Sequence, residues 1–270
     1  MMKVSINCYI IDINDPLDSG IVIRYHYMLS KLSERNKMIK ASVSFVLPMF
    51  NEEDNISSSI SSIKKVASEL TRDFEIVVVD DASTDSSARI VSGIASNDPS
   101  VKLFVLARNT KFGGAFARGF KEARKDTVMY MDSDMPVSLE DIKGAYAYSG
   151  EFDIVTGISK VKKGDTLTRK LISGFYNLLV RTLFGLTIRD INSGFKIVKR
   201  DIVKDLEFIS LSPFADVEIF LQAKRKNASI KQYPLIFRTR TGGKSYIARF
   251  PVILATFRDM FKVWFREITR

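Results

Sequence analysis

Apolar runs alternate with segments of helical periodicity from Ser42 onward, and each apolar run ends in a polar loop. The runs are hydrophobic at successive positions, which is typical of strands covered on both faces in a parallel sheet. This alternation predicts an α/β fold with a mainly parallel sheet flanked by helices. The expected strands are Val43–Leu47, Phe74–Val79, Val101–Leu106 and Thr127–Met131, and the expected helices are Asn55–Leu70, Ser86–Ala95 and Ala115–Arg124.

The polar loops that follow these strands are the first indication of function. In open parallel sheets, ligands bind beyond the carboxyl ends of the strands. We therefore expect the loops to meet at one edge of the sheet and to form a site there. They are Pro48–Glu52, Asp80–Asp85, Arg108–Gly114 and Asp132–Asp134.

The pattern is less regular beyond residue 150. β-like runs cover Asp153–Gly157 and Ser229–Phe237, and an apolar helix is expected over Leu167–Leu186. The last segment, Pro251–Arg270, has the periodicity of an amphipathic helix. Its predicted polar sector holds Arg258, Asp259, Lys262, Arg266 and Arg270, and its predicted apolar side holds Phe257, Met260, Phe261, Trp264, Phe265 and Ile268.

The chain is expected to have three parts. Residues 1–40 form an extension of unknown role, with a β-like run over Val4–Ile13 and a helix over Val22–Leu32. Residues 41–250 form the α/β domain. Residues 251–270 form the amphipathic helix, which either lies in a membrane interface or packs on the protein.

Composition limits the metal chemistry. The chain has one cysteine, Cys8, and one histidine, His26, so thiolate and multi-histidine metal centres are excluded. Any metal would be bound by oxygen ligands, which favours magnesium, manganese or calcium.

The net charge of +10 is spread unevenly along the chain. Residues 41–150 carry 12 basic and 16 acidic side chains, and residues 151–270 carry 23 and 11, or +12. A basic C-terminal part favours an anionic partner such as phosphate groups or a membrane surface, with a plain solvated surface as the alternative. Nucleic acid is not expected as a partner, because no recognition motif is present.

Membrane contact is expected to be peripheral. No run approaches the ~20 apolar residues that span a bilayer. Asp12, Asp15 and Asp18 interrupt the pattern of a signal peptide. We therefore predict an intracellular protein associated with the cytoplasmic face of the membrane.

Two pairs of acids are the main candidates for chemistry. Asp132 and Asp134 close a strand and can bracket a divalent cation that neutralises a diphosphate, with a turn role as the alternative. Asp80 and Asp81 also follow a strand, where a buried acid needs hydrogen-bond donors. A nucleobase would supply one, and a helix N-cap is the alternative role.

Phe50 and Lys111 are candidates for contacts with a nucleotide. The aromatic ring can stack on a base or pack in the core. Lys111 stands beside the glycine pair Gly113-Gly114 at the start of a helix, which suits close approach by a phosphate.

Together these loops resemble glycosyltransferase family 2, which has the GT-A fold. The resemblance rests on Val43–Glu53, Val79–Asp85 and Met131–Asp134. Asp190–Lys196 and Arg240–Ser245 resemble two further segments of its polyprenyl-phosphate sugar synthases, such as dolichyl-phosphate mannose and glucose synthases. The resemblance as a whole covers roughly residues 41–250.

The resemblance and the residue chemistry together give the candidate site. The expected contacts of the nucleotide sugar are Pro48, Phe50, Asn51, Glu52, Asp80, Asp81, Lys111 and Asp132, and the expected Mg²⁺ or Mn²⁺ ligands are Asp132 and Asp134. The expected contacts of an acceptor phosphate are Arg169, Ser173, Arg240 and Ser245, and the expected catalytic residues are Asp134, Asp190 and Arg240.

The resemblance implies an inverting, metal-dependent transferase that moves a hexose from UDP-glucose or GDP-mannose to a polyprenyl or dolichyl phosphate. Pro136 replaces a polar metal ligand of many mannose-type members, so glucose is at least as well supported. Two alternatives stay open: transfer to a glycan hydroxyl, for which Asp190 or Asp216 would act as base, and a silent sugar-nucleotide-binding protein. A homodimer or a membrane partner is also left open.

Overall fold

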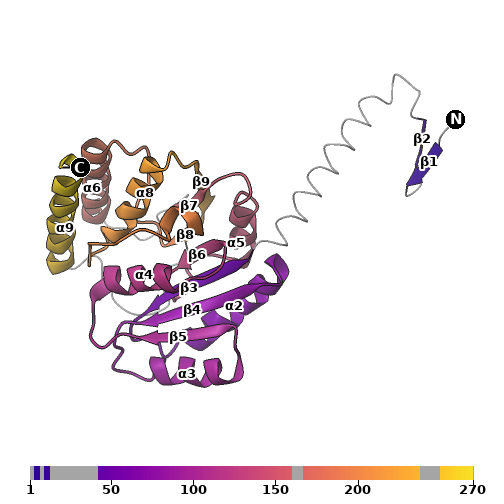
Figure 1. Ribbon diagram of the computed structural model, residues 1–270, viewed down its shortest axis with the longest axis horizontal. Coiled ribbons are helices and arrows are strands. Elements are labelled where there is room, and N and C mark those ends of the chain that lie inside the picture. The colour runs from indigo at the N-terminus through magenta and orange to yellow at the C-terminus, as the bar shows by residue number, and fades with distance from the viewer. Residues whose placement is uncertain (1–2, 7–8, 13–41, 160–166, 238–249, 270) are drawn as a thin grey trace. The chain divides into compact units, whose positions relative to one another are not determined.

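The computed structural model describes residues 3–6, 9–12, 42–159, 167–237 and 250–269 (Figure 1). The chain divides into two compact units, residues 1–40 and 41–270. In the first unit, β1 (Lys3–Ile6) and β2 (Tyr9–Asp12) pair antiparallel, so the β-like run expected over Val4–Ile13 is divided into two strands. The helix expected over Val22–Leu32 lies outside the described residues.

The second unit contains one sheet and the helices that cover it. Its strands are β3 (Val43–Met49), β4 (Phe74–Asp80), β5 (Val101–Val105), β6 (Thr127–Met131), β7 (Ile154–Ser159), β8 (Phe195–Lys199) and β9 (Ile230–Leu235). Its helices are α2 (Ile56–Leu70), α3 (Ser87–Asn97), α4 (Lys111–Glu122), α5 (Leu139–Tyr146), α6 (Leu167–Phe184), α7 (Arg200–Val203), α8 (Ala215–Arg225) and α9 (Phe250–Ile268).

The sheet has the order β5-β4-β3-β6-β8-β7-β9, and Figure 1 shows its first four strands side by side. The pairs β4–β5, β3–β4, β3–β6 and β7–β9 are parallel, as predicted. β8 is antiparallel to both of its neighbours. The mainly parallel α/β fold is therefore confirmed, with β8 as an addition that the sequence pattern did not predict.

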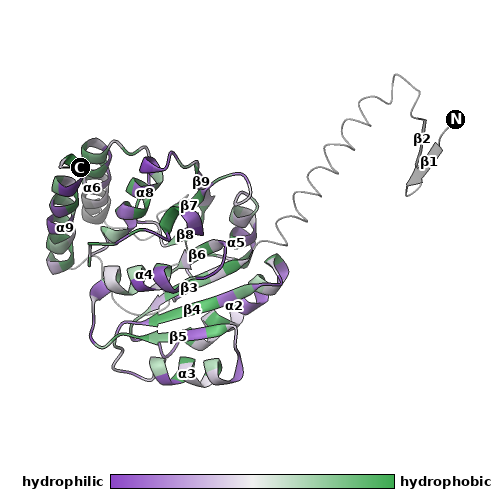
Figure 2. Cartoon of the chain, in the orientation of Figure 1, coloured by the Kyte–Doolittle hydropathy of each residue, from purple (hydrophilic) through white to green (hydrophobic). Residues whose placement is uncertain are grey.

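Strand order places the helices on two faces of the sheet. The chain moves outward from β3 to β5 and then crosses back to β6, so a right-handed crossover puts α4 on the face opposite α2 and α3. Successive side chains of a strand point to opposite faces of the sheet, and Val46 and Val79 point to the face that α4 covers, where they lie in the core. Gly119 permits this close packing, because a β-carbon there would stand 2.3 Å from Val46 Cγ1. Figure 2 shows β3 and β4 mainly in the colour of hydrophobic residues.

Hydrophobic periodicity did not predict α5. A capping pattern marks α5, since Ser138 Oγ accepts the Asp141 N–H at 3.0 Å, and Ser-x-x-Asp is readable in the sequence. α4 begins at Lys111 instead of Ala115, because packing against the rest of the domain overrides the weak helix propensity of Gly113-Gly114.

α9 has a different polar side from the predicted one. Asp259, assigned to the polar sector, is only 3% exposed. Its Oδ2 accepts the N–H groups of Leu211 and Ser212 at 3.1 and 3.0 Å, so this carboxylate fastens the helix to the domain. Part of the predicted apolar side is exposed instead, including Phe261 and Phe265. The periodicity was correct, but helical angle alone placed in the polar sector a carboxylate that is buried and binds backbone.

Asp153 joins the ends of three strands. Its Oδ1 lies 2.9 Å from Lys199 Nζ at the end of β8, and its Oδ2 accepts the Ser229 N–H at 2.8 Å just before β9. The Lys199 ammonium and the Ser229 donors lower the pKa of Asp153 from 3.8 to about 2. A lowered folded-state pKa stabilises the fold above pH ~4 and loses that contribution as the pH falls toward 2.

Asp153→Asn is therefore expected to lower the free energy of unfolding by about 1–2 kcal/mol at pH 7. The difference from wild type should shrink at pH 3, because the carboxyl group is then largely protonated in the unfolded wild-type chain and folding must release that proton. Urea unfolding at both pH values measures it, with the more exposed Asp205→Asn as the control. An equal difference at pH 7 and pH 3 would show that the charge is not the cause.

Candidate active site

The four predicted loops do follow four adjacent strands. β3 has β4 on one side and β6 on the other, so the connections leave β3 in opposite directions. In open α/β sheets, ligands bind at such a switch point beyond the carboxyl ends of the strands. Asp80 ends β4, the Pro48–Glu52 loop spans the end of β3, and Asp132 follows β6. The predicted convergence is confirmed for these strand ends.

Left-handed backbone conformations are concentrated at this edge of the sheet within the described chain. Asn51, Ala82, Lys111 and Met135 have positive φ angles of 55°, 58°, 67° and 51°. They are four of the five non-glycine residues of this kind in the described parts, and each belongs to a different one of these loops or directly follows it. Left-handed backbone at residues other than glycine is costly and concentrates at functional sites.

The loops after β3 and β4 are locked together by hydrogen bonds. The Asn51 N–H donates to Ser83 Oγ at 2.9 Å, and Asn51 Oδ1 accepts the Thr84 N–H at 2.8 Å. The Glu52 N–H donates to Ser87 Oγ at 2.8 Å. Asn51 thus has a structural task, and its predicted contact with a nucleotide stays a prediction.

Asp80 and Asp81 take different partners. The Asp80 carboxylate accepts the Ser83 N–H at 3.2 Å, and the Ser83 hydroxyl also donates to it, so Asp80 closes its own turn. Asp81 is 4% exposed, and its Oδ1 accepts the Thr110 N–H and hydroxyl at 2.6 and 2.7 Å. Burial raises the pKa of Asp81, and the Thr110 donors oppose the rise.

The glycine pair at the start of α4 is required by packing within the chain. A β-carbon on Gly113 would lie 2.4 Å from the Ser210 carbonyl oxygen, and one on Gly114 would lie 2.1 Å from Thr110 Oγ1. Chain atoms therefore occupy the space that we expected a phosphate to need. Lys111, next to them, is exposed.

Phe50 is 44% exposed in the loop after β3. The alternative that it packs in the core is therefore wrong, and an exposed aromatic ring suits base stacking. Pro48 and Glu52 are half-buried next to it. Asn55 Nδ2 donates to Glu52 Oε2 at 3.1 Å.

Asp132 and Asp134 lie half-buried directly after β6. Tyr130 OH donates to Asp132 Oδ1 at 2.8 Å. Ser59 of α2 donates to the Ser133 carbonyl at 2.6 Å and fixes the turn between the two acids. Both are carboxylates, so the donor set fits Mg²⁺ or Mn²⁺. No third acidic, histidine or cysteine ligand joins them among the described residues, so a bound diphosphate and water would complete the shell.

The Asp190–Lys196 segment lies next to Asp132. β8 pairs antiparallel with β6, and the Asp132 N–H donates to the Gly194 carbonyl at 3.3 Å. A β-carbon on Gly194 would stand 2.6 Å from Asp132 Oδ2, which explains the glycine of this motif. Asp190 Oδ2 accepts the Ser159 N–H at 3.3 Å.

α6 is tied to this segment by Asn177. Its Oδ1 accepts the Ile191 N–H at 3.3 Å, and its Nδ2 donates to the Ser173 carbonyl one turn earlier at 2.8 Å. The predicted acceptor contact Ser173 therefore lies on the turn of α6 that docks beside Asp190. The backbone of Arg169 lies in the same helix, but its side chain, Arg240 and Ser245 lie outside the described residues.

A buried ion pair was missed by sequence reasoning. Lys196 is 0% exposed and its Nζ lies 2.9 Å from Asp216 Oδ1. Burial raises the pKa of Asp216 to about 6, and Lys196 opposes the rise. Asp216 is 2% exposed and bound to a lysine, so it is poorly placed to serve as the base for a hydroxyl acceptor.

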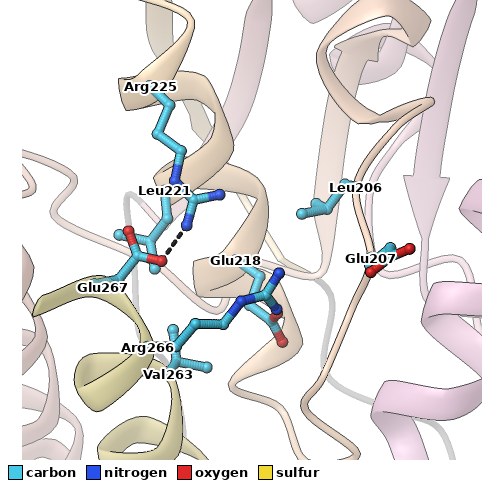
Figure 3. A pocket seen from close by; sticks show the side chains of 8 residues that line it. All are labelled: Leu206, Glu207, Glu218, Leu221, Arg225, Val263, Arg266 and Glu267. Carbon is cyan, nitrogen blue, oxygen red and sulfur yellow. Dashed lines mark hydrogen bonds and ion pairs between the residues drawn. The ribbon is translucent and has the colours of Figure 1, made fainter. Parts of the chain in front are cut away.

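A hollow between α8 and α9 lies apart from these residues (Figure 3). It is lined by Leu206, Glu207, Glu218, Leu221, Arg225, Val263, Arg266 and Glu267, none of which is a predicted site residue. Arg225 forms an ion pair with Glu267, and Glu218 Oε1 accepts the Ser210 N–H at 2.9 Å. The residues around this hollow hold α9 against the rest of the domain.

The sheet order, the switch point and the acidic pair beyond β6 are those of a GT-A fold. A sequence profile of glycosyl transferase family 2 matches residues 44–207, and the chain belongs to that family. The predicted family and the glycosyltransferase class are confirmed.

Similar sequences include the undecaprenyl-phosphate 4-deoxy-4-formamido-L-arabinose transferase of Pectobacterium carotovorum, 30% identical over 60% of this chain and 50% of that protein. Glycosyltransferase AglD of Haloferax volcanii is 27% identical over 84% of this chain and 38% of that protein. The chain thus spans about half or less of the length of these curated relatives.

Solved structures support the fold. Glucosyl-3-phosphoglycerate synthase of Mycobacterium tuberculosis in complex with UDP aligns with a TM-score of 0.67 and 17% identity, over 86% of this chain and 83% of that one. A crystal of that synthase with Mn²⁺, UDP-glucose and phosphoglyceric acid aligns with a TM-score of 0.64 and 20% identity, over 86% and 82%.

Gly114→Ala tests the packing of Thr110 against Asp81. The added methyl group must displace the Thr110 side chain, so we expect a loss of about 1–3 kcal/mol in the free energy of unfolding. Gly93→Ala in α3 is the matched control, because nothing lies within 4 Å of its β-carbon, and it should stabilise by about 0.5–1 kcal/mol. Equal effects of the two substitutions in urea unfolding would contradict this account.

Proposed function

We propose that this chain transfers a hexose from a nucleotide sugar, UDP-glucose or GDP-mannose, to a polyprenyl phosphate with inversion at the anomeric carbon. The observation that carries this proposal is the junction of two segments. The acidic pair after β6 and the Asp190 loop share one edge of the sheet, and Asn177 ties that loop to the acceptor turn of α6. The named undecaprenyl-phosphate transferase relative supports a polyprenyl phosphate acceptor.

The donor half has residues for each part of a nucleotide sugar. Phe50 presents an exposed ring for the base, and Glu52 and Asp81 supply carboxylates for base or ribose donors. Asp132 and Asp134 would hold Mg²⁺ or Mn²⁺, which when bound offsets the charge of the leaving diphosphate. Lys111 adds a cation at the start of α4.

The acceptor half needs orientation more than proton transfer. A lipid phosphate is anionic at pH 7, so its oxygen attacks the anomeric carbon in line without a strong base. Arg169 and Ser173 of α6, with Arg240 and Ser245, are the proposed phosphate contacts, since arginine suits bidentate binding of phosphate. The role of Asp190 is to shape this half of the site.

We place the lipid acceptor at a surface of α6 and α9. The exposed apolar residues of this surface are Phe175, Leu178, Phe250, Leu254, Phe261, Phe265 and Ile268. Arg258 and Lys262 are exposed beside them on α9. None of the described helices is both long enough and apolar enough to cross a bilayer. An aromatic stripe flanked by cations suits binding in the plane of an anionic membrane surface.

Transfer from radiolabelled sugar nucleotides to polyprenyl phosphate in detergent tests the reaction. UDP-glucose, GDP-mannose and UDP-N-acetylglucosamine are compared with Mn²⁺, with Mg²⁺ and with chelator. We expect metal-dependent label in the organic phase from one donor. Nucleotide binding without labelled lipid would reject the lipid acceptor and favour a hydroxyl acceptor or a silent binding protein.

Asp134→Asn is expected to lower transfer by about 100- to 1,000-fold, because one of the two metal-binding carboxylates loses its charge. The fold should stay intact, as judged by thermal unfolding and circular dichroism. Transfer near the wild-type rate would reject Asp134 as a metal ligand.

Phe261→Ser with Phe265→Ser is expected to reduce sedimentation with phosphatidylglycerol vesicles about 10-fold or more, because two exposed rings no longer enter the interface. Val105→Ser is the matched control, since Val105 is 59% exposed on the edge strand β5. Equal binding by the two variants would reject this surface as the membrane contact.

A further inference from the structure

A buried cation lies behind the acidic pair. Lys196 of β8 is fully buried, and the register of the antiparallel pair sets it directly opposite Tyr130 of β6. Its Nζ forms the ion pair with Asp216 and lies 5.7 Å from the centre of the Tyr130 ring. Phe220 of α8 stands on another side, with its ring centre 5.8 Å from Nζ.

Two short connections run from this ammonium group to Asp132. The first passes through Tyr130, whose ring packs near Lys196 Nζ and whose hydroxyl donates to Asp132 Oδ1 at 2.8 Å. The second passes through the backbone. Lys196 Nζ donates to the Ser193 carbonyl at 2.5 Å, and the next residue, Gly194, accepts the Asp132 N–H.

Two further carboxylates act on this ion pair. Asp132 and Asp190 both interact electrostatically with Asp216, which is itself paired with Lys196. Removing an ammonium group from water costs several kcal/mol, and an ion pair of this kind is often replaceable by apolar residues without loss of stability. Stability alone therefore gives little reason for a lysine at this position.

We propose that Lys196 is a positioning residue for Asp132: through Tyr130 and the Ser193–Gly194 peptide it fixes the orientation of the carboxylate that meets the metal–diphosphate group of the donor. The inference rests on the proposed function, because it assigns Lys196 to the donor half of that site. Groups that orient a metal ligand typically change metal affinity by 10- to 100-fold.

The test measures binding of UDP and of GDP by calorimetry, once with Mn²⁺ and once with chelator. Lys196→Met with Asp216→Asn removes both charges of the pair, so no buried charge is left without its partner. Tyr130→Phe is the second variant, since it keeps the ion pair and the ring and removes only the hydroxyl. Glu75→Gln is the control, because Glu75 is equally buried and paired with Lys102 but holds the chain near Ser44 and Arg124.

We expect the gain in affinity from Mn²⁺ to fall 10- to 100-fold in the double variant and about 3- to 10-fold in Tyr130→Phe. Affinity in chelator should stay within about 3-fold, since base contacts lie on other loops. Glu75→Gln should lower only the unfolding temperature.

Three outcomes would overturn the inference. An unchanged Mn²⁺ gain in the double variant and in Tyr130→Phe rejects it and leaves the proposed function standing. An equal loss with and without Mn²⁺ shows a merely structural pair. No Mn²⁺-dependent binding of either nucleotide by the wild-type protein rejects the metal-dependent donor site itself, and the inference with it.

Discussion

The antiparallel pairing of β8 with β6 is the contact on which the candidate site depends. It brings Gly194 against Asp132, although the two residues lie in different halves of the domain. The close approach leaves no room for a β-carbon at Gly194, so the carboxylate is confined on that side. Without β8, Asp132 would have no neighbouring strand on that side of β6. The backbone of β8 therefore forms one side of the site.

The parts of the fold that were predictable are those with local signals. β3 to β6 are nearly continuous apolar runs, and the loops after them are polar, so their order and their meeting at one edge follow from periodicity. β8 has no such signal. Lys196 interrupts its apolar pattern, and this lysine is buried only because Asp216 of α8 lies next to it. The position of β8 therefore depends on tertiary contacts, which local sequence patterns do not reveal. Only the family resemblance of the Asp190–Lys196 segment indicated that this part of the chain belongs to the site.

The same limit explains the misassignment of Asp259. Asp259 fits the polar side of α9 by helical angle, yet it binds two backbone N–H groups of another segment. Asp153, Asp80 and Glu218 likewise accept backbone N–H groups, those of Ser229, Ser83 and Ser210. Several carboxylates of this domain therefore hold backbone segments together, whatever ligand they were expected to bind. Sequence cannot separate the two roles, because the donors come from residues that only the fold brings near.

These clamps also connect the two halves of the proposed reaction. Asp259 of α9 binds the N–H of Leu211, and the carbonyl of Leu211 accepts the N–H of Gly113 in the first turn of α4. The residue before that turn, Thr110, binds Asp81 in the donor half. The helix proposed to meet the membrane is thus joined to the donor loop by a short series of partly buried hydrogen bonds. A lipid whose phosphate is held at α6 and whose chain lies at the surface of α6 and α9 would therefore be positioned by the same hydrogen-bonded body as a nucleotide held at Asp81. An in-line transfer between two bound substrates requires such an arrangement.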